Sequence, residues 1–267
     1  VIDHYTYVFL GDGCLMEGIS HEACSLAGTW GLGKLICFYD DNGISIDGEV
    51  AGWFTDDTPK RFEAYGWQVI RDVDGHDPDA VARAIRRAKR EKGKPTLICC
   101  KTIIGFGAPN KQGKEECHGA ALGADEVALA RKTLGWPHEP FVVPEDIRAA
   151  WDGRAAGKRA ESRWRRRFKA YEAEYPQLAA EFRRRMDAVL PEGFEAWIGE
   201  GAAAAQAAGQ ALATRQSSQS VLNALGPRLP ELLGGSADLT GSNNTRIKGT
   251  AAFSAAAPAG DYVHYGV

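Results

Sequence analysis

The chain has 267 residues, of which 44% are hydrophobic and 25% charged, with a formal net charge of −3 and a pI near 6.1. This balance lacks the basic excess of nucleic-acid-binding proteins, and no apolar run of about 18 residues predicts a membrane span. We therefore expect a globular protein of one large or two smaller domains, with neither nucleic acid nor a membrane as partner.

The six cysteines show no metal-ligand spacing, and most lie in apolar runs where free cysteine acts as a small hydrophobe. They are Cys14, Cys24, Cys37, Cys99, Cys100 and Cys117. With no signal peptide at the start, these features predict free thiols and a cytoplasmic location. The chain begins at Val1 without methionine and stops directly at Tyr-Gly-Val, residues 265–267, with no sequence signal for the end of a domain. We therefore expect it to be a segment of a longer protein.

The first elements form a βαβ pattern. Apolar runs at residues 5–10 and 35–39 predict two buried parallel strands, and residues 16–29 between them predict a helix. Asp12 follows the first strand and Asn42 the second, and their separation of 42 − 12 = 30 residues matches the length of a βαβ unit, roughly 30 residues. Both side chains should therefore lie at the carboxyl ends of neighbouring strands, where open α/β sheets bind ligands.

Oxygen atoms from Asp12 and Asn42 would converge there on a small hard cation, and Mg²⁺ prefers such ligands together with phosphate and water. Gly11 and Gly13 flank Asp12, and their lack of a side chain lets backbone N–H groups approach a diphosphate. The alternative is a pair of tight turns without an ion. The strand, helix and strand context favours the magnesium diphosphate site.

The next elements continue the alternation. Residues 59–65 predict a short helix, 67–73 a strand, 79–92 an amphipathic helix and 95–100 a third βα-linked strand. The fold class predicted is α/β, with a parallel sheet covered by helices on both faces.

The segment from Ile103 to Gly123 is a long loop rich in glycine and lysine, and loops of this length inside a domain are often functional. Helices are expected at 124–134 and 145–152. Residues 155–190 predict a charged helical region whose arginines suggest either a nucleic-acid surface or a solvated helix face. Aromatic residues at spacings of three and four, with glutamates among the arginines, favour the solvated face.

Beyond Pro191 the composition shifts to alanine and glycine, which predicts a flexible linker or an alanine-rich helix over 191–213. Residues 214–267 then predict the start of a second α/β domain. Its elements are a helix at 217–225, a strand ending at 232–236, a loop at 248–260 and a strand at 262–265.

The most specific motifs surround Asp12 and Asn42. Residues 11–23 read Gly-Asp-Gly-Cys-Leu-Met-Glu-Gly-Ile-Ser-His-Glu-Ala, and residues 38–48 read Phe-Tyr-Asp-Asp-Asn-Gly-Ile-Ser-Ile-Asp-Gly. Together they resemble the thiamine-diphosphate-dependent transketolase family. Three further blocks, at 52–58, 61–67 and 101–107, resemble that family in order, so the resemblance covers essentially the whole chain.

The resemblance implies a thiamine-diphosphate-binding fold. Residues 1–190 would be an N-terminally truncated diphosphate-binding domain with a helical extension, 191–213 a linker, and 214–267 the truncated start of a pyrimidine-binding domain. Asp12, Asn42 and the Ile44 carbonyl would bind Mg²⁺, although Ca²⁺ or another divalent cation is possible. In addition, Gly13 would meet the diphosphate and Ile46 would pack on the thiazolium ring.

The resemblance also assigns roles outside this stretch. His118 would be the catalytic histidine, near the cofactor diphosphate and the substrate, where an imidazole can move a proton near neutral pH. Without the family, a lone loop histidine is more often a surface residue, and His76 and the four others receive that interpretation. Glu17 and Glu22 would form a carboxylate relay at a homodimer interface, or would simply favour the helix start.

In the second domain the resemblance assigns Arg215 and Ser242 to sugar-phosphate binding and Asp238 to the cofactor. A guanidinium fork suits phosphate oxygens. However, Gly241 and Asn244 depart from many members of the family, and residues 246–258 follow no clear family pattern.

The implied reaction transfers a two-carbon ketol unit from a ketose phosphate to an aldose phosphate, as in the pentose phosphate pathway. The family glutamate that activates the cofactor would follow the Tyr-Gly-Val block at 265–267. Several substrate-binding histidines would precede Val1. We therefore predict that residues 1–267 alone are inactive, and measurable ketol transfer by the purified segment would refute this.

Three other interpretations compete. The first is another thiamine-diphosphate enzyme, such as a 2-oxo acid dehydrogenase component, which the blocks at 40–46 and 101–107 disfavour. The second is a non-catalytic module that binds thiamine diphosphate and Mg²⁺. The third is a nicotinamide-binding domain, which lacks support because no Gly-x-Gly-x-x-Gly follows a strand.

Overall fold

The computed structural model describes residues 2–267. It contains two compact units, one formed by Asp3–Trp151 and the other built from Asp152–Val267. In the part of the chain described, no helix is both long enough and apolar enough to cross a membrane.

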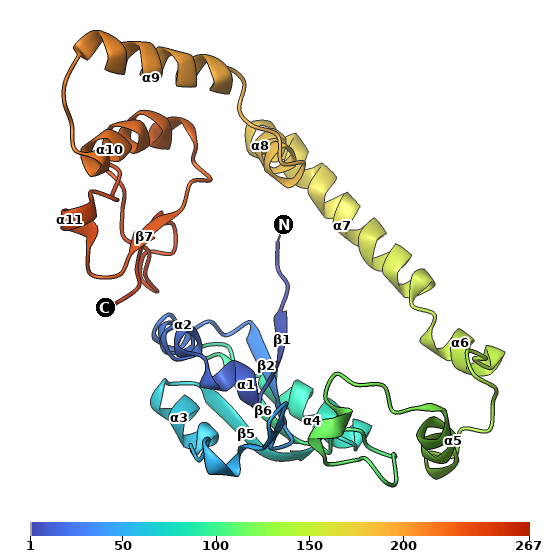
Figure 1. The fold of residues 1–267 in the computed structure, drawn as a ribbon. Helices are drawn as coiled ribbons and strands as arrows, with labels where there is room; N and C mark the ends of the chain where they lie inside the picture. Colours follow the sequence, from blue (N-terminus) through green and yellow to red (C-terminus); the bar gives the residue numbers. More distant parts are fainter. Residues whose placement is uncertain (1) are drawn as a thin grey trace. The chain divides into compact units, whose positions relative to one another are not determined.

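The first unit is built on a four-stranded parallel sheet in the order β1-β2-β6-β5 (Figure 1). The strands are β1 (Thr6–Gly11), β2 (Leu35–Asp41), β5 (Gln68–Asp74) and β6 (Thr96–Lys101). Each was predicted within two residues of its observed bounds. Because the βαβ register pairs Gly11 with Asp40, the ends of β1 and β2 lie side by side.

Helices cover both faces of this sheet, as predicted. Alternate residues of β2 and β6 point to opposite faces, so Tyr39 packs in one core cluster and Phe38 in the other. Helices α1 (Asp12–Met16), α2 (Gly18–Thr29) and α3 (Thr58–Ala64) contribute to the first cluster, and α4 (Pro78–Ala88) to the second. The two central strands, β2 and β6, are therefore buried on both sides, which explains why they read as continuous apolar runs. The prediction that residues 5–10 form a buried strand is wrong, because β1 is an edge strand of this sheet and its Phe9 is 79% exposed.

Two helices of this unit differ from the predictions, the first at its N-terminal end and α4 at its C-terminal end. The helix predicted at 16–29 is divided at Glu17, whose ψ of 133° is extended, so a short α1 begins directly after β1. Helix α4 ends at Ala88 rather than at residue 92. The Glu91 carboxylate accepts the backbone N–H groups of Lys92 and Gly93, which stabilises a turn there instead of helix.

Between β2 and α3 the chain forms a small hairpin of β3 (Ile44–Ser45) and β4 (Gly48–Glu49), followed by the 3₁₀ turn η1 (Val50–Gly52). The predicted loop after β6 contains the 3₁₀ turn η2 (Glu115–Cys117). Helices α5 (Ala124–Thr133) and α6 (Glu145–Trp151) complete the unit.

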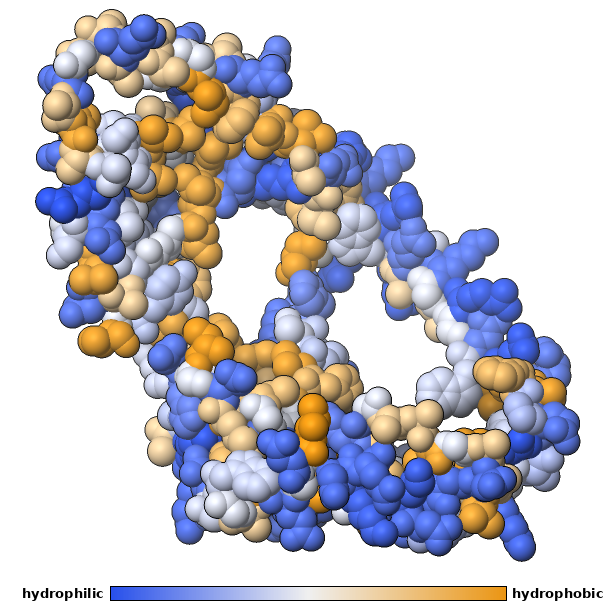
Figure 2. All heavy atoms as spheres, viewed as in Figure 1, coloured by the Kyte–Doolittle hydropathy of each residue, from blue (hydrophilic) through white to orange (hydrophobic). Residues whose placement is uncertain are grey.

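The second unit begins with α7 (Arg154–Glu174) and α8 (Pro176–Met186), which meet at Pro176. Phe168 is 6% exposed and stacks with Trp164 and Phe182, with ring centroids 5.1 and 5.3 Å apart. Glutamates pair with several arginines, as Glu161 does with Arg165. The surface of α7 turned to the viewer is largely hydrophilic (Figure 2), which agrees with the predicted solvated face.

The remaining elements of this unit are α9 (Phe194–Ala208), α10 (Thr214–Leu225), η3 (Gly226–Arg228), β7 (Gly234–Ser236), α11 (Thr240–Asn243) and β8 (Tyr262–His264). Much of the 191–213 segment is therefore helical, the second of the two forms expected for it. Strands β7 and β8 pair in parallel. Tyr262 of β8 is 1% exposed, and its hydroxyl lies 2.9 Å from Thr240 Oγ1 of α11.

Candidate functional site

A cavity of about 820 Å³ opens at the carboxyl ends of β1, β2 and β6. Its wall includes all six of the residues that the sequence assigned to cofactor and cation within the first unit. They are Asp12, Gly13, Asn42, Ile44, Ile46 and His118. We call this cavity the Asp12 pocket.

Asp12 is buried, with 4% exposure, and protein groups hold both of its carboxylate oxygens. The buried hydroxyl of Tyr39 donates to Oδ1, and the Gly43 N–H donates to Oδ2 over 3.0 Å. Gly43 has a φ of 70°, a left-handed conformation that glycine adopts without strain. A carboxylate can accept about four hydrogen bonds, so Asp12 keeps capacity for a further partner in the pocket.

The charge of Asp12 is poorly compensated. Burial raises the pKa of its carboxyl above the usual 3.8, against the opposing effect of hydrogen bonds from Tyr39 and Gly43, and the nearby carboxylates of Asp41 and Asp40 raise it further. Lys101 pairs with Asp41. The site therefore favours the arrival of positive charge.

Asn42 is oriented by its neighbours. Its amide nitrogen donates to Asp40 Oδ2 over 3.3 Å, and Asp40 is itself held by the Thr102 hydroxyl. The amide oxygen of Asn42 accepts the Ile44 N–H over 3.0 Å. A carbonyl oxygen has two lone pairs, so one acceptor position of Asn42 remains after this contact.

Ile46 occupies the tip of the β3–β4 hairpin and is 71% exposed. The hairpin is closed at its base because Val50 N–H donates to the Gly43 carbonyl over 3.0 Å. An exposed isoleucine on the wall of the pocket that Asp12 also lines provides a small apolar surface, and a flat apolar ring is the kind of group that it would contact.

His118 lies directly after η2, in the loop that follows β6, and its side chain is exposed on the pocket wall. The loop is held in place by hydrogen bonds, since both the backbone N–H and the side-chain amide of Asn110 donate to Glu126 over 2.8 Å. Gly105 adopts a φ of 66° there, and a Cβ at this position would lie 2.7 Å from Cys117 Sγ.

His76, which we interpreted as a surface residue, lines the same pocket. Its Nε2 accepts the Ile103 N–H over 2.9 Å, and its ring stacks on Phe106 with centroids 3.9 Å apart. Asp40 and Thr102 also line the pocket without having been singled out as site residues. No local sequence pattern distinguishes these residues, because only the parallel register brings the ends of β2, β5 and β6 together.

The other predicted site residues lie outside the pocket lining. Glu17 and Glu22 are exposed at the start and on the surface of α2. Arg215 on α10, Asp238 after β7 and Ser242 on α11 are exposed in the second unit. Asp238 has a φ of 51°, an uncommon left-handed conformation for a residue other than glycine.

Among residues 2–267 no group of three or more His, Cys, Asp and Glu side chains is placed to hold a metal ion. A cation in the Asp12 pocket would therefore take no more than two of these side chains, and amide, backbone or other oxygens would complete its coordination. Mixed oxygen coordination of this kind suits a hard divalent cation and differs from a structural zinc site.

The sequence matches two family models. Residues 1–191 match the thiamine diphosphate binding domain of transketolase, and residues 210–267 match the transketolase pyrimidine binding domain. Among curated proteins the chain is 61% identical over 267 residues to transketolase 2 of Escherichia coli and 61% identical to a plasmid-encoded transketolase of Cupriavidus necator. Each match covers the full chain and 40% of the relative, so the chain spans about 40% of the length of these proteins.

Solved structures give the same result. A Pichia stipitis transketolase in complex with sedoheptulose-7-phosphate matches with a TM-score of 0.87 and 44% identity, over 99% of this chain and 40% of that one. The Leishmania mexicana transketolase matches with a TM-score of 0.87 and 39% identity, over 99% and 39%. With its parallel sheet and both domain models matched, this chain belongs to the transketolase family.

Proposed function

We propose that this chain binds the diphosphate end of thiamine diphosphate together with a divalent cation, as part of a transketolase. That enzyme would transfer a two-carbon ketol unit from a ketose phosphate to an aldose phosphate. One observation carries the proposal: Asp12, Gly13 and Asn42 share a pocket with Ile46 and His118 at the carboxyl ends of parallel strands.

The donor set fits a hard cation. Asp12 would supply a carboxylate oxygen, Asn42 its amide oxygen and Ile44 its backbone carbonyl. Mg²⁺ suits this set because it commonly takes one or two carboxylates and completes its octahedron with phosphate and water. The raised pKa of Asp12 supports the assignment, because a cation would offset the cost of burying its charge.

The diphosphate would lie against Gly13. A Cβ built on Gly11 or Gly13 meets no atom within 4 Å, so the backbone there faces open space into which a phosphate fits. The Gly13 N–H would donate to a phosphate oxygen. Ile46 would cover the thiazolium ring, excluding water from the reacting carbon.

When bound, thiamine diphosphate supplies the carbon nucleophile that protein side chains lack. His118 would donate a hydrogen bond to a phosphate oxygen or exchange a proton with the reacting oxygen of the substrate. Its exposure on the pocket wall leaves room for such a substrate. Imidazole suits this role because it gains and loses a proton near neutral pH.

The second unit would supply the remaining contacts. We assign Arg215 and Ser242 to the phosphate of the sugar and Asp238 to the cofactor, with residues 1–190 as the diphosphate-binding domain, 191–213 as the connection and 214–267 as the start of the pyrimidine-binding domain. A guanidinium binds phosphate through two parallel hydrogen bonds, and exposed Arg215 is free to do so.

We further propose that the enzyme is a cytoplasmic homodimer of the pentose phosphate pathway. The six cysteines are free thiols, as expected in a reducing compartment. Glu17 and Glu22 would line the dimer interface, where Ile19, 69% exposed between them on α2, offers an apolar contact.

Isothermal titration calorimetry of the full-length enzyme with thiamine diphosphate and Mg²⁺ tests the central assignment. Loss of a residue that only hydrogen-bonds to a metal ligand costs about 10- to 100-fold in metal affinity. Asp12 is proposed as a direct ligand, so Asp12→Ala should weaken Mg²⁺-dependent cofactor binding by about 100-fold or more. Asp125→Ala, which removes an exposed carboxylate of α5, is the matched control and should bind normally. Unchanged binding by Asp12→Ala would overturn the assignment.

A further inference from the structure

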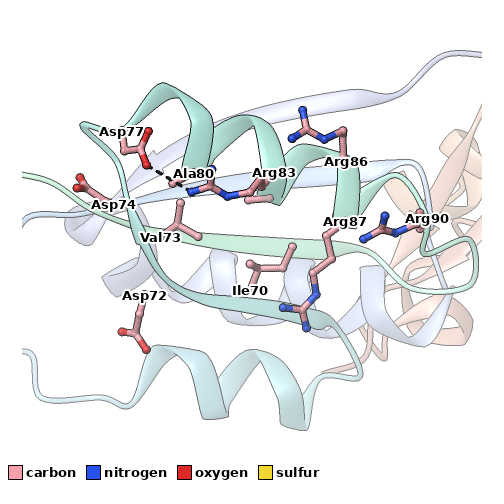
Figure 3. A pocket seen from close by; sticks show the side chains of 11 residues that line it. Ile70, Asp72, Val73, Asp74, Asp77, Ala80, Arg83, Arg86, Arg87 and Arg90 are labelled. Atoms are coloured by element: carbon pink, nitrogen blue, oxygen red, sulfur yellow. Dashed lines mark hydrogen bonds and ion pairs between the residues drawn. The ribbon is translucent and has the colours of Figure 1, made fainter.

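A second cavity, of about 630 Å³, lies along the edge of the sheet between β5 and α4. It shares no lining residue with the Asp12 pocket. The apolar side chains of Ile70, Val73 and Ala84 line it. Figure 3 shows charged side chains around Ile70 and Val73. We call this cavity the α4 groove.

An irregularity in β5 shapes this apolar lining. Ile70 and Val73 are three residues apart and would point to opposite faces of a regular strand, yet both pack in the cluster beneath α4. The register with β6 shifts between these two residues, and Asp72 adopts a φ of 53°. The bulge therefore places two apolar side chains and the Asp72 carboxylate along one groove.

Four arginines line the other side. Arg83, Arg86 and Arg87 belong to α4 at spacings of three and four residues, and Arg90 lies in the turn that follows the helix. Only Arg83 has an acidic partner, Asp77, over 3.4 Å; in the described part of the chain the other three form no ion pair. Like charges at these spacings destabilise a helix, and an anion bound among them would relieve that repulsion.

The groove is electrostatically polarised along its length. Figure 3 shows Asp72, Asp74 and Asp77 at one end and Arg86, Arg87 and Arg90 toward the other. A simple polyanion would meet repulsion at the aspartate end. A ligand with an anionic group at one end and hydrogen-bond donors at the other would instead match both ends.

We propose that the α4 groove binds a small phosphate ester, its phosphate held by Arg87 and Arg90 and its hydroxyl or amino groups donating to the aspartates. Guanidinium groups bind phosphate oxygens bidentately, and the apolar lining suits the carbon skeleton between the two ends. The cavity volume lies in the range of small-molecule sites. Nucleotides and sugar phosphates share this chemistry.

Hydrogen–deuterium exchange of α4 in the full-length enzyme tests the proposal. The enzyme is first saturated with thiamine diphosphate and Mg²⁺, and AMP, ribose 5-phosphate and inorganic phosphate are then added separately up to about 10 mM. At least one of the two esters should protect residues 78–92 at lower concentration than inorganic phosphate does. Stronger protection by AMP would identify the ligand as a nucleotide, and stronger protection by ribose 5-phosphate would identify it as a sugar phosphate.

Variants then test each end of the groove. The double substitution Arg87→Ala/Arg90→Ala should weaken ester binding by about tenfold or more, because two charged hydrogen-bonding groups are lost. Asp72→Asn should weaken ester binding while leaving that of inorganic phosphate unchanged. Arg163→Ala/Arg166→Ala, which removes two exposed arginines of α7 at the same spacing, is the matched control.

Thermal unfolding of each variant verifies that it is folded. If Arg87→Ala/Arg90→Ala does not fold, Arg87→Lys/Arg90→Lys replaces it. No protection of α4 by either ester, equal protection by inorganic phosphate, or full binding by the Arg87/Arg90 variants would each overturn the proposal. Protection by an acidic peptide but by neither ester would also overturn it.

Discussion

The Tyr39 hydroxyl donates a hydrogen bond to the Asp12 carboxylate, linking the end of β2 to the residue that follows β1. Both side chains are almost completely buried, at 3% and 4% exposure. Tyr39 in turn packs in the core cluster that α2 and α3 cover. The orientation of the proposed cation ligand therefore depends directly on the packing of the sheet.

Tyr39→Phe tests this dependence. The variant leaves a buried carboxylate without one of its donors, so we expect the free energy of unfolding to fall by about 1.5 to 3 kcal/mol. Affinity for Mg²⁺ in the presence of thiamine diphosphate should fall by about 10- to 100-fold. Denaturant unfolding and calorimetry measure the two effects. Tyr7→Phe, on the 42% exposed Tyr7 of β1, is the control; equal Mg²⁺ affinity in both variants would contradict a positioning role.

Ile46→Ala separates cofactor contact from folding. Because Ile46 is 71% exposed, its truncation should change the free energy of unfolding by no more than about 0.5 kcal/mol. Contact with an apolar ring would be reduced, so cofactor affinity should fall by about tenfold. Titration with thiamine diphosphate at saturating Mg²⁺ measures the cofactor affinity. Val142→Ala, at a 51% exposed position outside the pocket, is the control variant. Wild-type affinity in Ile46→Ala would remove Ile46 from the site.

Gly105→Ala tests the shape of the loop that carries His118. Alanine in a left-handed conformation costs about 1 to 2 kcal/mol, and the added Cβ would approach Cys117 Sγ at 2.7 Å. Gly113→Ala is a close control, since its φ is 74° but the nearest atom lies 3.9 Å away. Overpacking should make Gly105→Ala the less stable variant by about 1 kcal/mol or more in denaturant unfolding. Equal stabilities would show that Cys117 moves aside without cost.

Stability should depend on pH through Glu126. Hydrogen bonds from the Asn110 side chain and backbone lower the pKa of Glu126 below its usual 4.5. The folded state therefore binds this proton less readily than the unfolded state, so the stabilisation is present above pH 4.5 and is lost as the pH falls through the lowered pKa.

The thermal stability of wild type relative to Glu126→Gln should accordingly be constant near neutral pH and should decrease below about pH 4.5. Glu115→Gln, at an exposed carboxylate in the loop that precedes α5, controls for the loss of one charge. A wild-type advantage over Glu126→Gln that does not change with pH would contradict the role of the Asn110 contacts.

The sequence alone determined the α/β class, the four strands of the first sheet and the positions of Asp12 and Asn42 at the ends of two of them. These features are encoded locally, since continuous apolar runs mark strands, and glycine, aspartate and asparagine mark their carboxyl ends. Ile44, Ile46 and His118 were assigned only through the resemblance to the family. The motifs around Asp12 and Asn42 also indicated the family, which the family models confirmed.

Only the tertiary structure decided how the pocket is completed. His76, Asp40 and Thr102 enter it because β5, β2 and β6 end at the same edge of the sheet, a consequence of strand order that no local pattern records. The extended Glu17 that divides the first helix and the register shift around Asp72 are likewise features of the folded backbone that no local pattern marked. Burial and neighbouring charge, which raise the pKa of Asp12, exist only once the chain has folded.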